Sequence, residues 1–216
     1  MTRQVLIVSL LATVAGCFIL RDADARDRPY QVLKGQIAIV EGAPTLAPFQ
    51  HVRFCMRYPS ECKSNPAEVD RIELKEETLE LLRRVNTNVN IAIAPKLKSY
   101  GPQLEDSWKI APASGDCNDY ANTKRHELLE RGLPSRALRL SVVKTPSGIG
   151  HLVLVVATTR GDLVLDNLTD SIHTWQDTDY QWLKIQSAAD ARFWYDIRPA
   201  VRLAQADRHV RLAGRQ

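Results

Sequence analysis

Two consecutive runs of apolar and β-branched residues constrain the fold of this chain more than any other feature. The first run spans residues 151–158, the second spans residues 162–166, and a short connection containing glycine joins them. Such runs are typical of β-strands, and a short Gly-containing connection predicts an antiparallel hairpin. Further runs at residues 137–144 and 182–185 predict additional strands of the same sheet.

Helical patterns precede these strands. Residues 66–94 carry apolar side chains at helical spacing, after an Asn-Pro pair that is typical of a helix start, and Pro95 ends the pattern. A second helix is predicted over about residues 116–131, because Ser114 or Asp116 can cap its first turn and a glycine follows its last. Helices followed by an antiparallel sheet indicate an α+β fold, with N-terminal helices packed on the sheet. Residues 26–52 show few periodic signals and are interpreted as a loosely structured entry segment.

The predicted hairpin aligns a histidine with a carboxylate. If residues 158–161 form a four-residue loop, residue 157 pairs with residue 162, and Asp166 falls opposite Val153. Val153 lies on the same face of the sheet as His151, since side chains alternate along a strand. His151 and Asp166 are therefore expected to be diagonal neighbours, within reach of a hydrogen bond.

The second predicted helix places Cys117 in its first turn, directly after Gly115 and Asp116. The partial positive charge of a helix N-terminus favours a thiolate, which is the nucleophilic form, and the N–H groups there can receive a developing oxyanion. Gly115 is expected to leave room for a substrate. A cysteine nucleophile needs a base and a group that orients the base, so Cys117, His151 and Asp166 form a candidate catalytic triad. A buried, inert thiol is the alternative for Cys117 considered alone.

The first 25 residues have the layout of a secretory signal peptide. Arg3 precedes an apolar stretch at residues 5–20, and an Ala-Asp-Ala sequence at residues 23–25 offers a cleavage site. Cleavage there would leave residues 26–216 as one domain, in the periplasm or secreted. Cys17 offers an alternative as the modified residue of a lipoprotein, and an uncleaved membrane anchor is a third reading.

Three cysteines remain after residue 25. Cys55 and Cys62 are seven residues apart around a turn-prone Tyr-Pro-Ser sequence, and in an exported protein they are predicted to form a disulfide. Cys117 is then the unpaired thiol. The net charge of +4 is small and no long Lys/Arg run accompanies it, so nucleic-acid binding is not expected. The histidines at positions 51, 126, 173 and 209 lack the context of His151 and are expected at the surface.

Several segments together resemble the bacterial transglutaminase-like cysteine proteinase family. They are GDCNDYANTKRHELLERGLP, TPSGIGHLVLVV, GDLVLDNLTD and YQWLKIQS, with FCMRYPSEC, VNTNVN and DSW upstream, and they cover roughly residues 53–187. The resemblance implies a papain-like, transglutaminase-like fold and a thiol protease whose Cys, His and Asp correspond to Cys117, His151 and Asp166. It also implies a protein substrate that is exported or on the cell surface, as for family members that release a biofilm adhesin. A regulatory receptor in the inner membrane is a candidate partner.

The resemblance also bears on calcium and on Trp108. Calcium-binding members have Asp-Cys-Glu-Asp around the nucleophile, where this chain has Asn118 in place of the glutamate. Asp116 and Asp119 are the candidate calcium ligands, but calcium is not expected to be required, because ligand charge sets calcium affinity and both acids can serve as helix N-terminal acids. Trp108 is expected near the thiol, in the oxyanion site or acyl pocket, because related folds put a tryptophan there. An ordinary core tryptophan is the alternative.

Two other functions fit the same residues. Acyl transfer to an amine, the transglutaminase reaction, proceeds through the same acyl-thioenzyme as proteolysis and differs in the acceptor. A non-catalytic binding module on the same fold is the third reading, and the missing family glutamate at Asn118 keeps it open.

Overall fold

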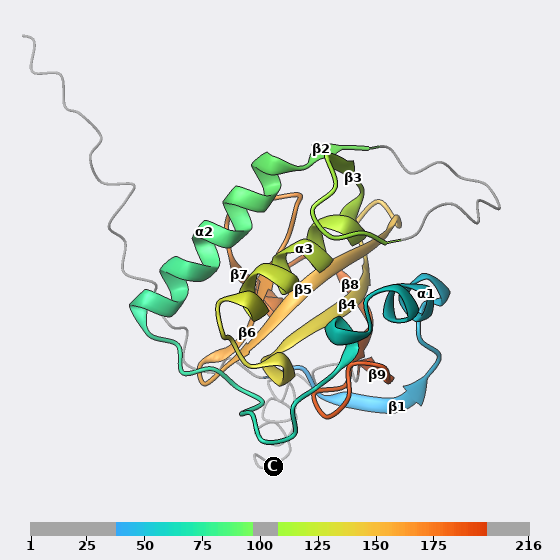
Figure 1. Ribbon diagram of the computed structural model, residues 1–216, viewed down its shortest axis with the longest axis vertical. Coiled ribbons are helices and arrows are strands. Elements are labelled where there is room, and N and C mark those ends of the chain that lie inside the picture. Colours follow the sequence, from blue (N-terminus) through green and yellow to red (C-terminus); the bar gives the residue numbers. More distant parts are fainter. Residues whose placement is uncertain (1–37, 97–107, 198–216) are drawn as a thin grey trace, which may run out of the picture. The chain divides into compact units, whose positions relative to one another are not determined.

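The computed structural model describes residues 38–96 and 108–197 of the 216-residue chain (Figure 1). These residues belong to one compact unit. The predicted signal peptide at residues 1–25, including Cys17, lies outside the described residues. Among the helices that are described, none combines the length and the apolar character needed to cross a membrane.

A seven-stranded sheet with the order β1-β9-β8-β4-β5-β6-β7 forms the centre of the described structure, and all of its pairings are antiparallel. Its strands are β1 (Glu41–Thr45), β4 (Leu138–Lys144), β5 (Gly150–Thr158), β6 (Gly161–Leu165), β7 (His173–Thr174), β8 (Gln181–Gln186) and β9 (Trp194–Ile197). A separate parallel pair consists of β2 (Ala94–Pro95) and β3 (Ser114–Gly115). This pair joins the end of one helix to the start of the next.

The helices are α1 (Phe49–Arg57), α2 (Glu76–Ala92) and α3 (Cys117–Glu130), with short 3₁₀ turns at Pro59–Cys62, Ser135–Ala137 and Trp175–Asp177. Figure 1 shows α2 and α3 lying across one face of the sheet, and α3 packs on β4 and β5. After its first residue β5 is buried at every position, as expected for a central strand that is covered on both faces. The predicted α+β fold, with helices packed on an antiparallel sheet, is confirmed.

One apolar cluster is built from side chains of β4, β5, β6 and β8 and of residues beside β1 and β7. Its buried members are Ile39, Val143, Val153, Val155, Val164, Trp175 and Ile185, and three half-buried side chains, Tyr180, Trp182 and Ile197, pack against them. Val153 and Val155 belong to the predicted hairpin and lie on one face of the sheet, since side chains alternate along a strand.

The helix predicted over residues 66–94 begins later than expected, at Glu76. The Asn65 side chain accepts a hydrogen bond from the backbone N–H two residues on, so the Asn-Pro signal makes a turn instead of a helix cap. Ile72 then pairs with the hairpin, where its N–H donates to the carbonyl oxygen of Ala157 at 2.9 Å. These long-range contacts override the local helical pattern.

The entry segment is more ordered than the sequence indicates. Its end, up to residue 52, contains β1, which pairs with β9, and the start of α1. The prediction of a loose segment is therefore wrong for these residues. β1 carries mixed polar and apolar side chains without strict alternation, and its partner strand lies about 150 residues later in the chain.

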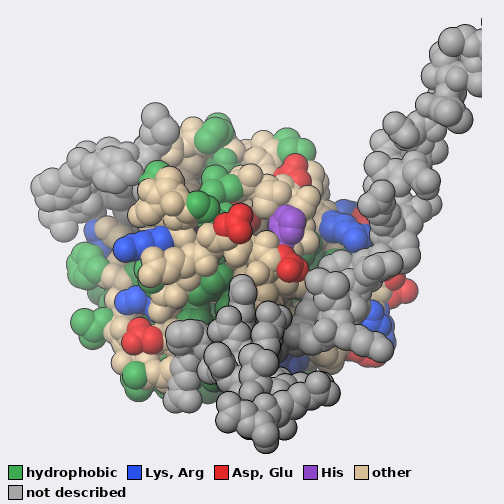
Figure 2. Space-filling view, turned by 180° about the vertical axis from the view of Figure 1, so that it is seen from behind, with side chains coloured by type: hydrophobic (Ala, Val, Ile, Leu, Met, Phe, Trp, Pro, Cys, Tyr) green, Lys and Arg blue, Asp and Glu red, His purple; other side chains and the backbone are tan. Residues whose placement is uncertain are grey.

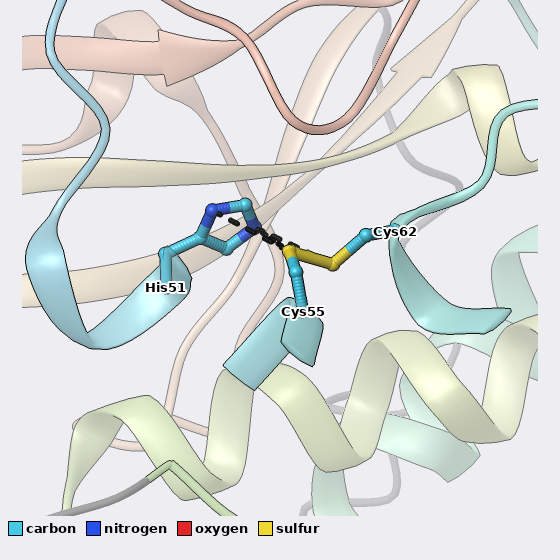
Figure 3. Close-up of side chains that lie close together, drawn as sticks. All are labelled: His51, Cys55 and Cys62. Atoms are coloured by element: carbon cyan, nitrogen blue, oxygen red, sulfur yellow. Dashed lines mark hydrogen bonds between the residues drawn. A yellow bond between two sulfur atoms is a disulfide. The ribbon is translucent and has the colours of Figure 1, made fainter. Parts of the chain in front are cut away.

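Cys55 and Cys62 form the predicted disulfide, which ties α1 to the following 3₁₀ turn (Figure 3). His51 lies one helical turn before Cys55, with Nε2 3.4 Å from its sulfur. The imidazole is 1% exposed, so the prediction that His51 lies at the surface is wrong. Burial, followed by the nearby charge of Arg125, lowers the pKa of His51 to about 4, and the ring is therefore neutral. The indole N–H of Trp194 donates to its Nδ1 at 3.2 Å.

Candidate active site

The hairpin of β5 and β6 has the expected register. Ala157 pairs with Asp162, and the pairing continues to Thr158 and Gly161, so two residues form the turn where a four-residue loop is expected. Gly161 has a φ of 114°, in the region that favours glycine. Both connections contain an even number of residues, so the shorter turn leaves Asp166 on the expected face of the sheet.

His151 and Asp166 are in direct contact. Nε2 of His151, the second residue of β5, lies 2.7 Å from Oδ1 of Asp166, which directly follows β6. Both side chains are buried. Asp166 accepts two further hydrogen bonds, from the Tyr180 hydroxyl to Oδ2 and from the Leu168 backbone N–H to Oδ1 at 3.0 Å. Three donors therefore fix the orientation of this carboxylate.

Tyr180 is a site residue that the sequence reasoning missed. Its ring packs edge-on against the imidazole of His151, with centroids 5.7 Å apart. Burial, and after it the hydrogen bond to Asp166, raises the pKa of Tyr180 well above its usual range, so the hydroxyl stays protonated and donates. The available signal was its place at the start of the segment YQWLKIQS, directly before β8.

Cys117 reaches the same histidine from α3. It is the first residue of that helix, is 8% exposed and is not disulfide-bonded. Its side chain is a hydrogen-bonding partner of His151. Because Nε2 of His151 faces Asp166, Nδ1 is the ring nitrogen left for the sulfur. The packing of α3 on β5 thus brings the three predicted residues together.

The charges of the site favour a protonated histidine. Burial is the largest effect on His151 and lowers its pKa, but the hydrogen bonds to Asp166 and Cys117 outweigh it and raise the pKa to about 9. Burial likewise raises the pKa of Asp166, and the hydrogen bonds from His151 and its other donors hold it below its usual range. At neutral pH an imidazolium therefore lies between a carboxylate and the Cys117 sulfur, an arrangement that favours the thiolate.

A capping box starts α3. Asp116 Oδ1 accepts from the Asn118 N–H at 2.9 Å, and Asp119 Oδ2 accepts from the Asp116 N–H at 3.1 Å. Asp119 Oδ1 accepts from the Lys109 N–H at 2.8 Å, which ties the preceding segment to the helix. A Cβ at Gly115 would lie 2.5 Å from Asp119 Oδ2, so the close approach that requires glycine here is that of Asp119.

The same capping limits the oxyanion donors at this helix end. The backbone N–H groups of Asn118, Asp119 and Tyr120 all donate to Asp116, two of them to its carbonyl oxygen and one to its carboxylate. These three N–H groups therefore already have acceptors, in contrast to the expectation that the first turn offers open donors to a substrate.

The predicted calcium ligands do not form a typical calcium site. Asp119 uses both carboxylate oxygens to accept backbone N–H groups, and Asp116 Oδ1 accepts both the N–H and the side-chain Nδ2 of Asn118. Calcium takes six to eight oxygen ligands, usually with several negative charges. No third acidic side chain among the described residues joins Asp116 and Asp119 in a metal-binding group. The described residues here do not fit the ion.

Another cluster has metal-ligating side chains. His51, Cys55 and Cys62 place their ligand atoms within 4.8 Å of one another (Figure 3). The two sulfurs are joined in the disulfide, so neither is a thiolate that binds a metal. The cluster therefore fixes α1 to the 3₁₀ turn that follows it.

Trp108 is buried, and its ring packs against α1. The centroid of its ring lies 5.8 Å from the ring centroid of His51 and 6.2 Å from that of Phe54. The next residue, Lys109, is hydrogen-bonded to Asp119 in the first turn of α3. Trp108 therefore connects α1 to the start of α3, and its contribution to an acyl pocket stays a prediction.

The surface beside the Asp166–Tyr180 pair is hollowed. A cavity of about 320 Å³ is lined by these two residues together with His173, Asp177 and Asp179 among others. On the face opposite to that of Figure 1, Figure 2 shows a histidine side chain with acidic side chains around it. The cavity beside the Asp166 carboxylate is therefore lined by two further acids, Asp177 and Asp179.

Comparison with known proteins identifies the family. A model of the bacterial transglutaminase-like cysteine proteinases matches residues 41–201. The chain belongs to this family. The resemblance deduced from the sequence segments is thus confirmed, as is the prediction that the chain is a cysteine peptidase, and a protein substrate follows from membership of a proteinase family.

Solved structures of LapG from Legionella pneumophila are similar to this bacterial transglutaminase-like cysteine proteinase. The calcium-bound form is 22% identical, with a TM-score of 0.48 over 65% of this chain and 82% of that one. The EGTA-treated form is 20% identical, with a TM-score of 0.47 over 71% and 81%. Comparison with curated proteins gave no match. The roles of individual residues therefore rest on the geometry of this chain.

Proposed function

We propose that this cysteine proteinase is exported and cleaves a periplasmic or surface protein through Cys117, His151 and Asp166. The proposal rests mainly on one observation: His151, 2.7 Å from the Asp166 carboxylate, also has the Cys117 side chain as a hydrogen-bonding partner. A cysteine protease needs a nucleophile, a base and an orienting group in this order of contact.

Each residue has a separate role in the proposed reaction. The Cys117 sulfur attacks the carbonyl carbon of a peptide bond, and His151 delivers its proton to the amine nitrogen as that group leaves. A water molecule then attacks the thioester, His151 accepts the proton of that water, and the carboxylic acid product leaves as the Cys117 sulfur is released. Asp166 holds the imidazole in one orientation and stabilises its cation.

The direct test compares exported proteins from cells that carry wild-type protein with those from cells that carry Cys117→Ser. At least one surface or secreted protein should be shortened only in the presence of the wild type, and the purified wild type should cleave that protein. Cys117→Ser and His151→Ala should have no measurable turnover, and the double variant Cys117→Ser/Asp166→Asn should be no worse than Cys117→Ser, because such residues act as a unit. If Cys117→Ser, shown to be folded by circular dichroism, keeps wild-type turnover, the nucleophile is misassigned.

Experiments with the purified protein and its substrate distinguish proteolysis from the other two functions. Incorporation of a labelled primary amine into the substrate in place of cleavage would indicate acyl transfer. A thiol-reactive acyl probe that leaves Cys117 unlabelled in folded protein would favour a non-catalytic binding module.

Export is proposed from the sequence of residues 1–25. Sequencing of the mature N-terminus should begin near Arg26, whereas a lipid-modified Cys17 would indicate a lipoprotein. A regulatory receptor in the inner membrane is proposed from the family resemblance, and co-purification from detergent-solubilised membranes tests it. We further propose that turnover does not need calcium, because both carboxylate oxygens of Asp119 and Oδ1 of Asp116 already accept hydrogen bonds from backbone N–H groups.

A further inference from the structure

Two asparagines on α2 reach the loop that carries Asp166. Asn86 and Asn90 are four residues apart, so they lie on the same face of the helix. Both direct their Nδ2 groups at residues 166–170, which lie between β6 and β7. About 80 residues of chain separate the asparagines from this loop, so the contacts are purely tertiary.

Asn90 holds the backbone of the triad residue itself. Its Nδ2 donates to the carbonyl oxygen of Asp166 at 3.0 Å and to Oδ1 of Asp170 at 2.8 Å. It thereby joins the first and last residues of the loop. His151 and Tyr180 form hydrogen bonds with the side-chain oxygens of Asp166, whereas Asn90 forms one with the backbone carbonyl oxygen of Asp166.

Asn86 holds the far end of the loop. It is completely buried, and its Nδ2 donates to the carbonyl oxygens of Thr169 and Asp170 at 3.2 and 3.1 Å. Between these anchors Leu168 is 60% exposed, so the middle of the loop has little packing of its own. The two asparagines therefore supply side-chain hydrogen bonds that attach this loop to α2.

A buried lysine adds charge at the same place. Lys124, on α3, is completely buried, and its Nζ has no hydrogen-bond partner within the described structure. Burial lowers the pKa of Lys124 to about 7, while the charges of Asp166 and Asp170 oppose that effect. The carboxylates of Asp166 and Asp170 thus favour the protonated form of a buried lysine on the helix that begins with Cys117.

We propose that Asn90, assisted by Asn86, is a positioning residue that holds Asp166 at hydrogen-bonding distance from His151. The inference rests on the proposed function, because it assigns the asparagines to the orienting group of the triad. Without the Nδ2 donors the loop loses its anchors, the carboxylate moves away from the imidazole, and the imidazolium that activates Cys117 is lost. A displacement of about 1 Å at such a group can lower a rate by as much as about 100-fold.

The test measures activation of Cys117 and needs no substrate. The full chain is treated with iodoacetamide between pH 5 and 9, and alkylation of Cys117 is followed by mass spectrometry of its peptide. The wild type should react at neutral pH far faster than its denatured form. Asn90→Ala should react about tenfold more slowly at pH 6.5, with its rate profile displaced toward that of an ordinary thiol.

Matched variants separate positioning from folding. Asn88→Ala removes an exposed asparagine of the same helix and should react as the wild type does. Asn90→Asp keeps the size of the side chain, removes the N–H donors and places a carboxylate beside Asp170, so it should react as slowly as Asn90→Ala. Circular dichroism and an intact disulfide show that each variant is folded.

The outcomes are distinct. If the wild type is activated and both Asn90 variants match it across the pH range, Asn90 does not position Asp166. If Asn88→Ala is slowed as much as Asn90→Ala, the effect belongs to the helix in general, and the proposal is again wrong. If Cys117 of the folded wild type reacts no faster than in the denatured chain, the proposed function fails, and the positioning role with it.

Discussion

The Asp166 carboxylate is expected to account for the unusual charge state of His151, and replacing it with asparagine tests that relation. Asp166→Asn keeps the side-chain volume and removes the negative charge. In the wild type the pKa of His151 is about 9, against an ordinary 6.5, although burial alone would lower it. The difference corresponds to about 3 kcal/mol in favour of the imidazolium form. Without the carboxylate, burial should lower the pKa of His151 clearly below 9, although the hydrogen bond to Cys117 still opposes that fall.

Histidine side-chain NMR measures this change directly. Titration of the ring protons, with His151→Ala to identify the resonance, should give a pKa near 9 for the wild type and a clearly lower pKa for Asp166→Asn. Asp179→Asn removes an exposed acid close to Tyr180 and should leave the value unchanged. A pKa that stays near 9 in Asp166→Asn would refute the reasoning, since the carboxylate would not be its cause.

Stability should change with pH in the corresponding way. A pKa that is raised in the folded state contributes stability that is fully present below about pH 6.5 and is lost as the pH rises through about 9. The free energy of unfolding, measured by denaturant titration, should therefore fall more between pH 6 and pH 10 for the wild type than for Asp166→Asn. Equal differences in both proteins would contradict the assignment.

Four other predictions concern the disulfide, the start of α3, Trp108 and calcium. Replacing Cys55 and Cys62 with serine should lower the free energy of unfolding by about 2.5 kcal/mol, as expected for a closed loop of about eight residues, and three free thiols in the unreduced, denatured mature chain would contradict the disulfide. Gly115→Ala should cost about 1–3 kcal/mol, because its Cβ would meet Asp119, and an unchanged melting temperature would show that the helix start tolerates the methyl group. Trp108→Phe should lower turnover of a cleavable substrate without altering circular dichroism; full turnover would leave Trp108 a core residue. EGTA should change neither turnover nor melting temperature, and calorimetric heat at millimolar calcium together with lost activity on chelation would contradict this.

The local conformations around the site follow from near neighbours in the chain. Asp116 precedes Cys117 as the cap of α3, and Gly132, with a φ of 81°, ends the helix region as a glycine signal predicts. The hairpin follows from two β-branched runs and a glycine turn. Torsion preferences and hydrogen bonds within a few residues decide these elements, and a sequence displays both.

The His151–Asp166 contact could also be predicted from the sequence. Side chains alternate along a strand, and any turn with an even number of residues keeps both on one face, so a wrong loop length did not disturb the contact. The disulfide of Cys55 and Cys62 is similarly local, seven residues apart across a short turn.

The sequence by itself thus determined the helix that begins at Cys117, the hairpin with its histidine and aspartate, and the disulfide, because neighbouring residues specify each. Only the tertiary structure decided that Ile72 pairs with the turn end of the hairpin, that His51 is buried, and that Tyr180 and Asn90 are hydrogen-bonded to Asp166. The Asn90 contact spans 76 residues. Periodicity tells which face of an element is apolar, but it does not tell which distant face covers it, because all elements must pack at once to settle that choice.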